Sequence, residues 1–228
     1  MGNVIEFRNI TKYFPGVKAL DDISFTANGG EVLALMGENG AGKSTLLKVL
    51  NGDYQQTSGE YLVNGEPCHF NSPREAVAAG IGVIYQERQI MLELTVGENI
   101  FLGRLPTGFM GRIKMREVHR KAQAIIDEFG LDMKSTDKVK DLSVAYQQMV
   151  EIMKAYSREN LKMIAFDEPT ASLSDSEIDS LFRIIRKLKA EGKVIIYVSH
   201  RMAEIRQIAD HLAASSGSRW ISPTHELL

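Results

Sequence analysis

The chain has 228 residues, enough for one large domain with a sizeable core, and its 44% hydrophobic and 25% charged residues are ordinary for a globular protein. Its 27 basic side chains are balanced by 29 acidic ones, and a net charge of −2 argues against a general nucleic-acid binder, which carries a basic excess. The single cysteine, Cys68, excludes an internal disulfide and favours a reducing compartment.

The N-terminus, MGNVIEFRNI, lacks the basic start and the apolar core of a signal peptide. No stretch of the sequence approaches the ~20 apolar residues that span a bilayer, so any work at a membrane would depend on a partner. β-rich runs follow at residues 4–7, 23–26 and 32–36. The stretch YLVNGEPCHF predicts a hairpin, because Asn64-Gly65 suits a two-residue turn that needs positive φ.

The run GENGAGKST, residues 37–45, fits the pattern G-x-x-x-x-G-K-S/T of a phosphate-binding loop. It follows a predicted strand and opens a predicted helix over 44–50, the context that this motif requires. Glycines let backbone N–H groups surround phosphate oxygens, Lys43 supplies a charge for the β- and γ-phosphates, and Ser44 offers a hydroxyl to Mg²⁺. The residues expected to contact nucleotide here are Gly37, Asn39, Gly40, Gly42, Lys43, Ser44 and Thr45. A glycine-rich loop that contains lysine by chance is the alternative.

A short helix with clear boundaries comes next, in SPREAVAAG. Ser72 is expected to cap it, Glu75 to complete a capping box, and Gly80 to end it. The apolar run 81–85 then predicts a strand. Gln86, in VIYQE, stands at the carboxyl end of this strand, from where it would reach Mg²⁺ or the attacking water. An ordinary polar loop residue is the alternative for Gln86.

From about residue 95 to 157 the pattern turns helical, which predicts an inserted helical lobe at about 88–157. Within it, LSVAYQQMVEI places Ser143 just ahead of an apolar helical pattern, where it would cap a helix.

Two strand–helix units follow. The apolar strand 163–166, in MIAFDEP, leads to Asp167 and Glu168 at the end of a strand where ligands bind in parallel sheets. Asp167 would hold Mg²⁺ through water and Glu168 would polarise the attacking water, the alternative being a surface turn. The strand 194–198, in VIIYVSHRM, leads to His200, for which we expect a γ-phosphate contact rather than a structural role. Strands that alternate with helices imply a parallel sheet covered on both faces.

In this order, GENGAGKST, VIYQE, LSVAYQQ, MIAFDEP and VSHRM resemble the motifs of the ATP-binding-cassette (ABC) ATPase family, over about residues 4–209. The resemblance implies an α/β P-loop NTPase core, a mainly parallel sheet flanked by helices, with an N-terminal antiparallel β layer and the inserted helical lobe. It also implies ATP and Mg²⁺ as ligands. The family's signature usually reads LSGGQ and acts across a head-to-tail pair of cassettes. Ser143 would then donate to the γ-phosphate of the partner's ATP, and the small Ala145 would let the backbone approach.

The chain departs from the family's pattern at two places. Val144 and Ala145 replace signature glycines, so the backbone approach is expected to be looser, and Ser174 stands where the family usually carries Asp in the loop that crosses the dimer. Crosstalk between the two sites would therefore differ. For adenine, Phe14 in KYFPGVKAL matches the family's stacking aromatic, with Tyr13 as a second candidate and a core role for Phe14 as the alternative.

Other stretches resemble the first cassette of bacterial monosaccharide importers of the arabinose, ribose, galactose and xylose type; they include FPGVKALDDISF, QQMVEI and FDEPTASLS. This resemblance implies a cytoplasmic ATPase, peripheral on the inner face of the cell membrane, that energises sugar import. Its partners would be a second cassette, transmembrane permease subunits and, indirectly, a periplasmic or extracellular sugar-binding protein, but no nucleic acid.

The stretch LAASSGSRWISPTHELL departs from the family, which continues into a further apolar strand. Its small and polar residues at 213–216 predict a poor core strand. We therefore interpret the chain as a single nucleotide-binding domain over 1–228 with an atypical tail at 211–228, and we expect Trp220 on the surface or in a loose contact. A truncated gene, a fragment or an altered terminus would each explain the tail, since such proteins normally carry two fused cassettes.

Two other functions stay open. One is a soluble ABC ATPase that acts on DNA or ribosomes, although the sequence has neither the heptad run nor the basic block that such proteins tend to carry. The other is a remnant that binds nucleotide without turnover, which the short chain and the unusual tail favour.

Overall fold

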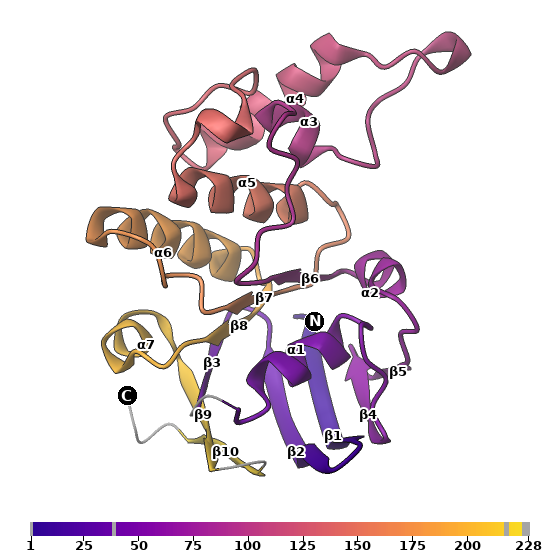
Figure 1. Cartoon of the computed structure of the whole chain (residues 1–228), viewed down its shortest axis with the longest axis vertical. Helices are drawn as coiled ribbons and strands as arrows, with labels where there is room; N and C mark the ends of the chain where they lie inside the picture. Colours follow the sequence, from indigo (N-terminus) through magenta and orange to yellow (C-terminus); the bar gives the residue numbers. More distant parts are fainter. Residues whose placement is uncertain (1, 38–39, 217–218, 225–228) are drawn as a thin grey trace. The chain divides into compact units, whose positions relative to one another are not determined.

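The computed structural model describes residues 2–37, 40–216 and 219–224, and the chain divides into two compact units. The first unit consists of Met1–Gln86, Asn160–Ala171 and Phe182–Leu228, and the second of Glu87–Glu159 and Ser172–Leu181. Figure 1 labels the helices and strands of both units.

The N-terminal part of the first unit is an antiparallel sheet. Its strands are β1 (Val4–Phe14), β2 (Val17–Asn28), β4 (Ser58–Val63) and β5 (Glu66–Cys68), in the order β2-β1-β4-β5. The predicted hairpin is confirmed, because β4 pairs with β5 and the turn residues Asn64 and Gly65 have φ values of 56° and 82°. This sheet is the antiparallel layer that the sequence predicts.

A second, mainly parallel sheet forms the other part of this unit. Its strands are β3 (Val32–Met36), β6 (Ile81–Ile84), β7 (Met163–Asp167), β8 (Val194–Val198), β9 (His211–Ser216) and β10 (Arg219–Thr224), in the order β10-β9-β3-β8-β7-β6. Every pairing is parallel except that of β10 with β9. All residues of β7 and β8 are buried, as expected for parallel strands covered on both faces.

Helices cover these sheets. They are α1 (Lys43–Leu50), α2 (Pro73–Ala79), α7 (Met202–Ile208) and the C-terminal part of α6 (Asp175–Ala190). In α1, the buried Leu46, Leu47 and Leu50 belong to one core cluster with residues of both sheets, including Phe7 of β1 and Ile196 of β8. The helix is therefore fixed between the two sheets by its apolar face.

The caps of α2 agree with the sequence only in part. Ser72 accepts a hydrogen bond from the Glu75 amide at 3.4 Å, and Gly80 ends the helix with φ at 98°. The predicted capping box is wrong in its second half, because the Glu75 carboxylate accepts from the Asn71 amide at 2.9 Å. In a capping box, the Glu75 carboxylate would accept from the backbone amide of Ser72; here it accepts from the amide of Asn71.

The expectation of a poor core strand at 213–216 is wrong, because these residues belong to the regular strand β9 (His211–Ser216). β9 pairs in parallel with β3 over four residues, and its Leu212 and Ala213 are 3% and 0% exposed. Ala213 belongs to the main core, while Leu212 packs with Ala34 of β3 on the other face. Small residues have a low strand propensity, but here pairing with a central strand and burial on both faces override it. The side chain of Trp220 is outside the part of the structure that is described, so the prediction for Trp220 stays a prediction.

The second unit is helical. It contains α3 (Val96–Ile100), α4 (Met115–Glu128), α5 (Val144–Tyr156), the first turns of α6, and the short 3₁₀ helices η1 (Phe109–Gly111) and η2 (Val139–Asp141). Helix α3 contacts both α4 and α5. None of the helices in the described ranges is long and apolar enough to cross a membrane.

Parallel pairing decides where the polar residues of the first unit meet. The strands β3, β6, β7 and β8 all end at the same edge of the sheet. The glycine-rich loop follows β3, Gln86 comes soon after β6, Glu168 follows β7, and His200 comes soon after β8. This edge is therefore where a ligand of the parallel sheet is expected.

Candidate functional site

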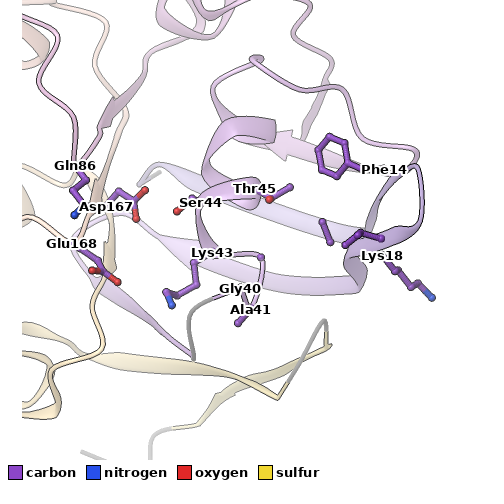
Figure 2. A pocket seen from close by; sticks show the side chains of 13 residues that line it. Phe14, Lys18, Gly40, Ala41, Lys43, Ser44, Thr45, Gln86, Asp167 and Glu168 are labelled. Carbon is purple, nitrogen blue, oxygen red and sulfur yellow. The ribbon is translucent and has the colours of Figure 1, made fainter.

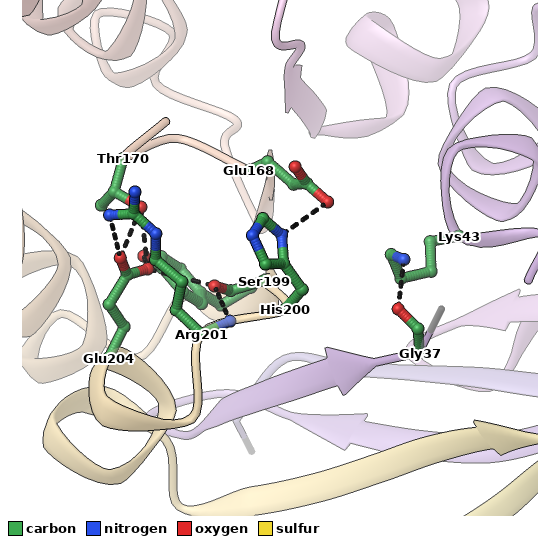
Figure 3. Close-up of polar contacts among 9 residues, drawn as sticks. Gly37, Lys43, Glu168, Thr170, Ser199, His200, Arg201 and Glu204 are labelled. Atoms are coloured by element: carbon green, nitrogen blue, oxygen red, sulfur yellow. Dashed lines mark hydrogen bonds and ion pairs between the residues drawn. The ribbon is translucent and has the colours of Figure 1, made fainter. Parts of the chain in front are cut away.

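The loop before α1 is built for close approach of its backbone to a ligand. Gly42 caps α1 with φ at 83°, and a Cβ atom there would lie 2.3 Å from the Ala19 carbonyl oxygen. Only glycine meets both conditions. Lys43 is 7% exposed, and its Nζ donates to the Gly37 carbonyl oxygen at 2.6 Å (Figure 3). The Lys43 ammonium and the N-terminus of α1 thus both bring positive charge to the glycine-rich loop.

This loop lines one wall of a cavity of about 700 Å³ (Figure 2). The sequence-predicted residues that line the cavity are Phe14, Gly40, Gly42, Lys43, Ser44, Thr45, Gln86, Asp167 and Glu168. Figure 2 shows Phe14 to one side of α1, with Gln86 and the two acidic residues to the other. Of the remaining predicted loop residues, Gly37 contacts Lys43, and Asn39 lies outside the described residues.

At the end of β7, the carboxylate of Asp167 meets the hydroxyl group of Ser44. Asp167 is 7% exposed, and burial raises the pKa of its carboxyl group, an effect that a hydrogen bond with Ser44 opposes. The charge of Glu168 also raises this pKa, while the charge of Lys43 lowers it. A buried carboxylate beside a hydroxyl is a donor set that suits a hard cation such as Mg²⁺.

Glu168 has an unusual backbone. Its φ is 47°, in the left-handed region that residues other than glycine rarely adopt, and its amide donates to the Val198 carbonyl oxygen at 3.0 Å. Its carboxylate Oε1 lies 3.3 Å from Nδ1 of His200 (Figure 3). The His200 side chain is 58% exposed and is not a lining residue of the cavity, so it reaches the cavity's wall through Glu168.

The aromatic candidates differ in their position. Phe14 lines the cavity and contacts the Tyr54 ring edge-on, with ring centroids 5.3 Å apart. Tyr13 is 47% exposed and does not line it. Sequence reasoning missed Lys18, which lines the cavity together with its neighbours Val17 and Ala19. These three residues lie in the stretch KYFPGVKAL, but the resemblance assigned a ligand contact only to its aromatic residues; the pairing of β2 with β1 holds them beside Phe14.

In the second unit, Ser143 caps α5. Its Oγ accepts from the Tyr146 amide at 3.4 Å and donates to Glu177 Oε1 at 3.3 Å. Ser174 donates to the same carboxylate through its amide and its hydroxyl, and these bonds hold the pKa of Glu177 below its usual range. The segment that begins at Ser143 and the segment of Ser174, which both depart from the family's pattern, are thus joined through Glu177 within this unit.

The two small residues after Ser143 face different ways. Ala145 is 2% exposed, whereas Val144 is 40% exposed. Of these two side chains, only that of Val144 faces solvent beside the exposed Ser143, and any close contact of Ala145 with nucleotide would involve its backbone. The nucleotide contacts of Ser143 and Ala145 stay predictions.

A family model described as ABC transporter matches residues 20–171. The chain belongs to this family. The match includes the glycine-rich loop, Asp167 and Glu168 at the end of β7, and Ser143, whereas Phe14 and His200 lie outside it. The predicted family and the predicted α/β fold with an antiparallel layer are therefore confirmed.

Several ABC relatives are about half identical to the chain. The Arabinose import ATP-binding protein AraG of Yersinia pestis is 50% identical over 217 residues, which are 95% of this chain and 41% of the relative. AraG 1 of Burkholderia ambifaria is 49% identical over 228 residues, or 100% of this chain and 45% of the relative. AraG of Vibrio parahaemolyticus is 52% identical over 206 residues, 90% and 40% of the two chains. The chain therefore spans less than half the length of these relatives.

Solved ABC structures share the fold. A nucleotide-free ATP-binding cassette of an ABC transporter superposes with a TM-score of 0.83 at 28% identity, over 97% of this chain and 90% of the other. Another ATP-binding cassette of an ABC transporter gives a TM-score of 0.85 at 30% identity, over 98% and 91% of the two chains.

Proposed function

We propose that this chain binds and hydrolyses ATP and that it thereby energises the import of a monosaccharide through a membrane ABC transporter. The observation that carries the proposal is that one cavity is lined by the phosphate loop, by Asp167 and Glu168 at the end of β7, by Gln86 and by the ring of Phe14. The names of the relatives, which are arabinose import ATP-binding proteins, support the choice of a sugar.

Binding follows from the wall that contains α1. The triphosphate lies along the loop between Gly40 and Ser44, where backbone amides and the helix N-terminus favour negative charge. Lys43 exchanges the Gly37 carbonyl oxygen for the β- and γ-phosphate oxygens, which carry full charge and bind its ammonium more strongly. At the other side of α1, Phe14 stacks on the adenine.

The acidic side of the cavity fits Mg²⁺. Ser44, Asp167 and Gln86 offer a hydroxyl, a carboxylate and an amide oxygen. In the described part of the chain, no three His, Cys, Asp or Glu side chains cluster as a metal site by themselves. This pattern suits Mg²⁺, which binds few carboxylates and takes its other ligands from phosphates and water. When bound, Mg²⁺ neutralises charge on the β- and γ-phosphate oxygens.

Hydrolysis depends on Glu168. Its carboxylate accepts a proton from water as the water oxygen bonds to the γ-phosphorus, and the bond from that phosphorus to the β,γ-bridging oxygen breaks. The electron pair of that bond leaves on ADP. His200, 3.3 Å from Glu168, holds this carboxylate in place, and in this proposal its exposed ring contacts the γ-phosphate when ATP is bound.

A complete site needs a second cassette. Ser143 caps α5 with its hydroxyl at the helix N-terminus, and this arrangement suits the γ-phosphate of ATP held by a partner. The other partners in this proposal are transmembrane permease subunits and, through them, a sugar-binding protein outside the membrane. The chain would work on the cytoplasmic face of that membrane.

One argument for a remnant that binds nucleotide without turnover was a poor strand near the end of the chain. This argument no longer holds, because β9 pairs with β3 and buries Leu212 and Ala213. Nothing in the described residues favours DNA or ribosomes as a partner.

The test measures phosphate release from MgATP by the purified chain over a range of protein concentrations, followed by co-purification with permease subunits of a sugar importer. We expect hydrolysis that rises faster than linearly with concentration until dimers saturate, and retention on the permease. ATP binding without phosphate release at any concentration would support the remnant. Turnover stimulated by DNA or ribosomes, without permease binding, would support the soluble ATPase.

A further inference from the structure

To one side of the pair formed by Glu168 and His200 lies a buried carboxylate that the proposed hydrolysis does not use (Figure 3). Glu204, on α7, is 6% exposed. It accepts hydrogen bonds from four side chains: Thr170 Oγ1 at 2.8 Å, Tyr197 OH at 3.0 Å, Ser199 Oγ at 3.1 Å and a guanidinium nitrogen of Arg201 at 3.1 Å. A buried carboxylate is stable only when it is paired and hydrogen-bonded, so this set of donors fixes Glu204 in one position.

The donors come from the two segments that carry the catalytic pair. Thr170 stands two residues after Glu168, and Ser199 and Arg201 stand on either side of His200. The Arg201 amide also donates to Ser199 Oγ at 3.0 Å, which closes this segment on itself. One carboxylate thus joins the end of β7 to the end of β8 beyond the last residues of the sheet ladder.

The backbone conformation of Glu168 indicates what the hydrogen bonds of Glu204 stabilise. A glutamate with φ at 47° is strained, and such a conformation persists only where the surrounding structure fixes it. On one side, the Glu168 amide is held by the Val198 carbonyl oxygen. On the other side, the side chain that anchors the following turn is Thr170, and its hydroxyl donates to both oxygens of Glu204.

We propose that Glu204 is a positioning residue for ATP hydrolysis. It holds the segments of Thr170 and of Ser199–Arg201 so that the Glu168 carboxylate and the His200 ring face each other at 3.3 Å. This inference rests on the proposed function, since it assigns Glu204 to the same reaction without contact to substrate. Its effect is on turnover and not on ATP binding, because Glu204 does not line the cavity.

The test compares single deletions of hydroxyl groups that all donate to Glu204. Ser199→Ala and Thr170→Val remove the donors beside His200 and Glu168, and Tyr197→Phe is the matched control, because Tyr197 is equally buried but flanks neither residue. We expect Ser199→Ala and Thr170→Val to lower kcat at least ~10-fold with KM for ATP unchanged, since small misplacements of catalytic groups have effects of this size or more. Tyr197→Phe should keep kcat within about twofold.

A second measurement reports position without turnover. The chain has five histidines, and the His200 ring signal in an NMR spectrum is assigned by its absence from His200→Gln. Glu204→Gln keeps the shape but removes the charge and one acceptor oxygen. We expect it to shift the His200 signal and to leave that of His69 in place.

Unequal losses and a shifted His200 signal support the positioning role. Equal effects of all three hydroxyl deletions on kcat, in step with their effects on the unfolding temperature, would show a structural role only and overturn the proposal. An unshifted His200 signal in folded Glu204→Gln would also overturn it. If Glu204→Gln does not fold, the same spectrum of Ser199→Ala decides. A wild-type chain that hydrolyses no ATP would refute the proposed function, while the NMR comparison would still test the arrangement.

Discussion

Replacing Lys43 with Met tests the phosphate site directly. Lys43 is 7% exposed and its Nζ already donates to the Gly37 carbonyl oxygen at 2.6 Å, so most of its hydration is lost before a phosphate binds. Methionine keeps an apolar stem of similar length but removes the charge. Losing a charge-assisted contact to phosphate costs about 2–3 kcal/mol, which corresponds to a Kd for MgATP raised roughly 30- to 150-fold.

The stability of the variant should change much less. The lost hydrogen bond to Gly37 costs about 1 kcal/mol, and removal of a buried cation offsets part of it. The assay is calorimetric titration with MgATP, accompanied by urea unfolding to show that the Lys43→Met chain is folded.

Lys48→Met is the matched control. Lys48 is on the same helix, its Nζ lies 5.4 Å from the centroid of the Tyr54 ring, and it does not line the cavity. We expect its Kd to stay within about twofold of the wild-type value. Unchanged MgATP affinity in folded Lys43→Met, or an equal loss in Lys48→Met, would refute the assignment of the phosphate site.

Three further predictions concern the acidic side and the second unit. Glu168→Gln should retain MgATP affinity while kcat falls by ~10²-fold or more, as for a lost general base, and phosphate release at the wild-type rate would mean that another group activates the water. Burial raises the pKa of Asp167 above its ordinary 3.8, so the folded state binds this proton more tightly than the unfolded state does. The free energy of unfolding therefore falls as pH rises from 3.8 through the raised pKa. Asp167→Asn should therefore be more stable than wild type to urea at neutral pH, with a flatter pH dependence and weaker MgATP binding; a loss of stability at neutral pH would contradict the dominance of burial. Mixing Ser143→Ala with Lys43→Ala chains should restore some turnover, since one site of the mixed dimer keeps both groups, and mixtures no more active than the separate variants would contradict the head-to-tail pair.

Local patterns were sufficient for several elements. The glycine-rich loop could be predicted because its glycines, its lysine and the flanking strand and helix are all contiguous in sequence. The turn at Asn64-Gly65 needed only two residues that tolerate positive φ. The Ser143 cap was likewise predicted from one hydroxyl ahead of an apolar helical pattern.

Other features could not be predicted locally. The stretch of small residues in β9 forms a strand because β3 lies beside it. Lys18 lines the cavity because β2 folds back on β1, and the resemblance of FPGVKALDDISF to the family did not single it out as a lining residue. The hydrogen bonds of Glu204 depend on residues from two different strand ends, so its sequence context on a short helix gave no indication of them.

The sequence by itself thus determined the kinds of groups and the order in which they occur: a phosphate loop, two carboxylates after a buried strand, a histidine after another, and a capped helix between them. These are short-range properties, because each depends on side chains within a few residues of one another. The tertiary structure decided which of them meet. Parallel pairing of β3, β8, β7 and β6 brings Lys43, Gln86 and Glu168 to one edge of the sheet, and the strained backbone of Glu168 turns its carboxylate to His200. Such contacts join distant parts of the chain, and only the register of the sheet and the packing of the core specify them.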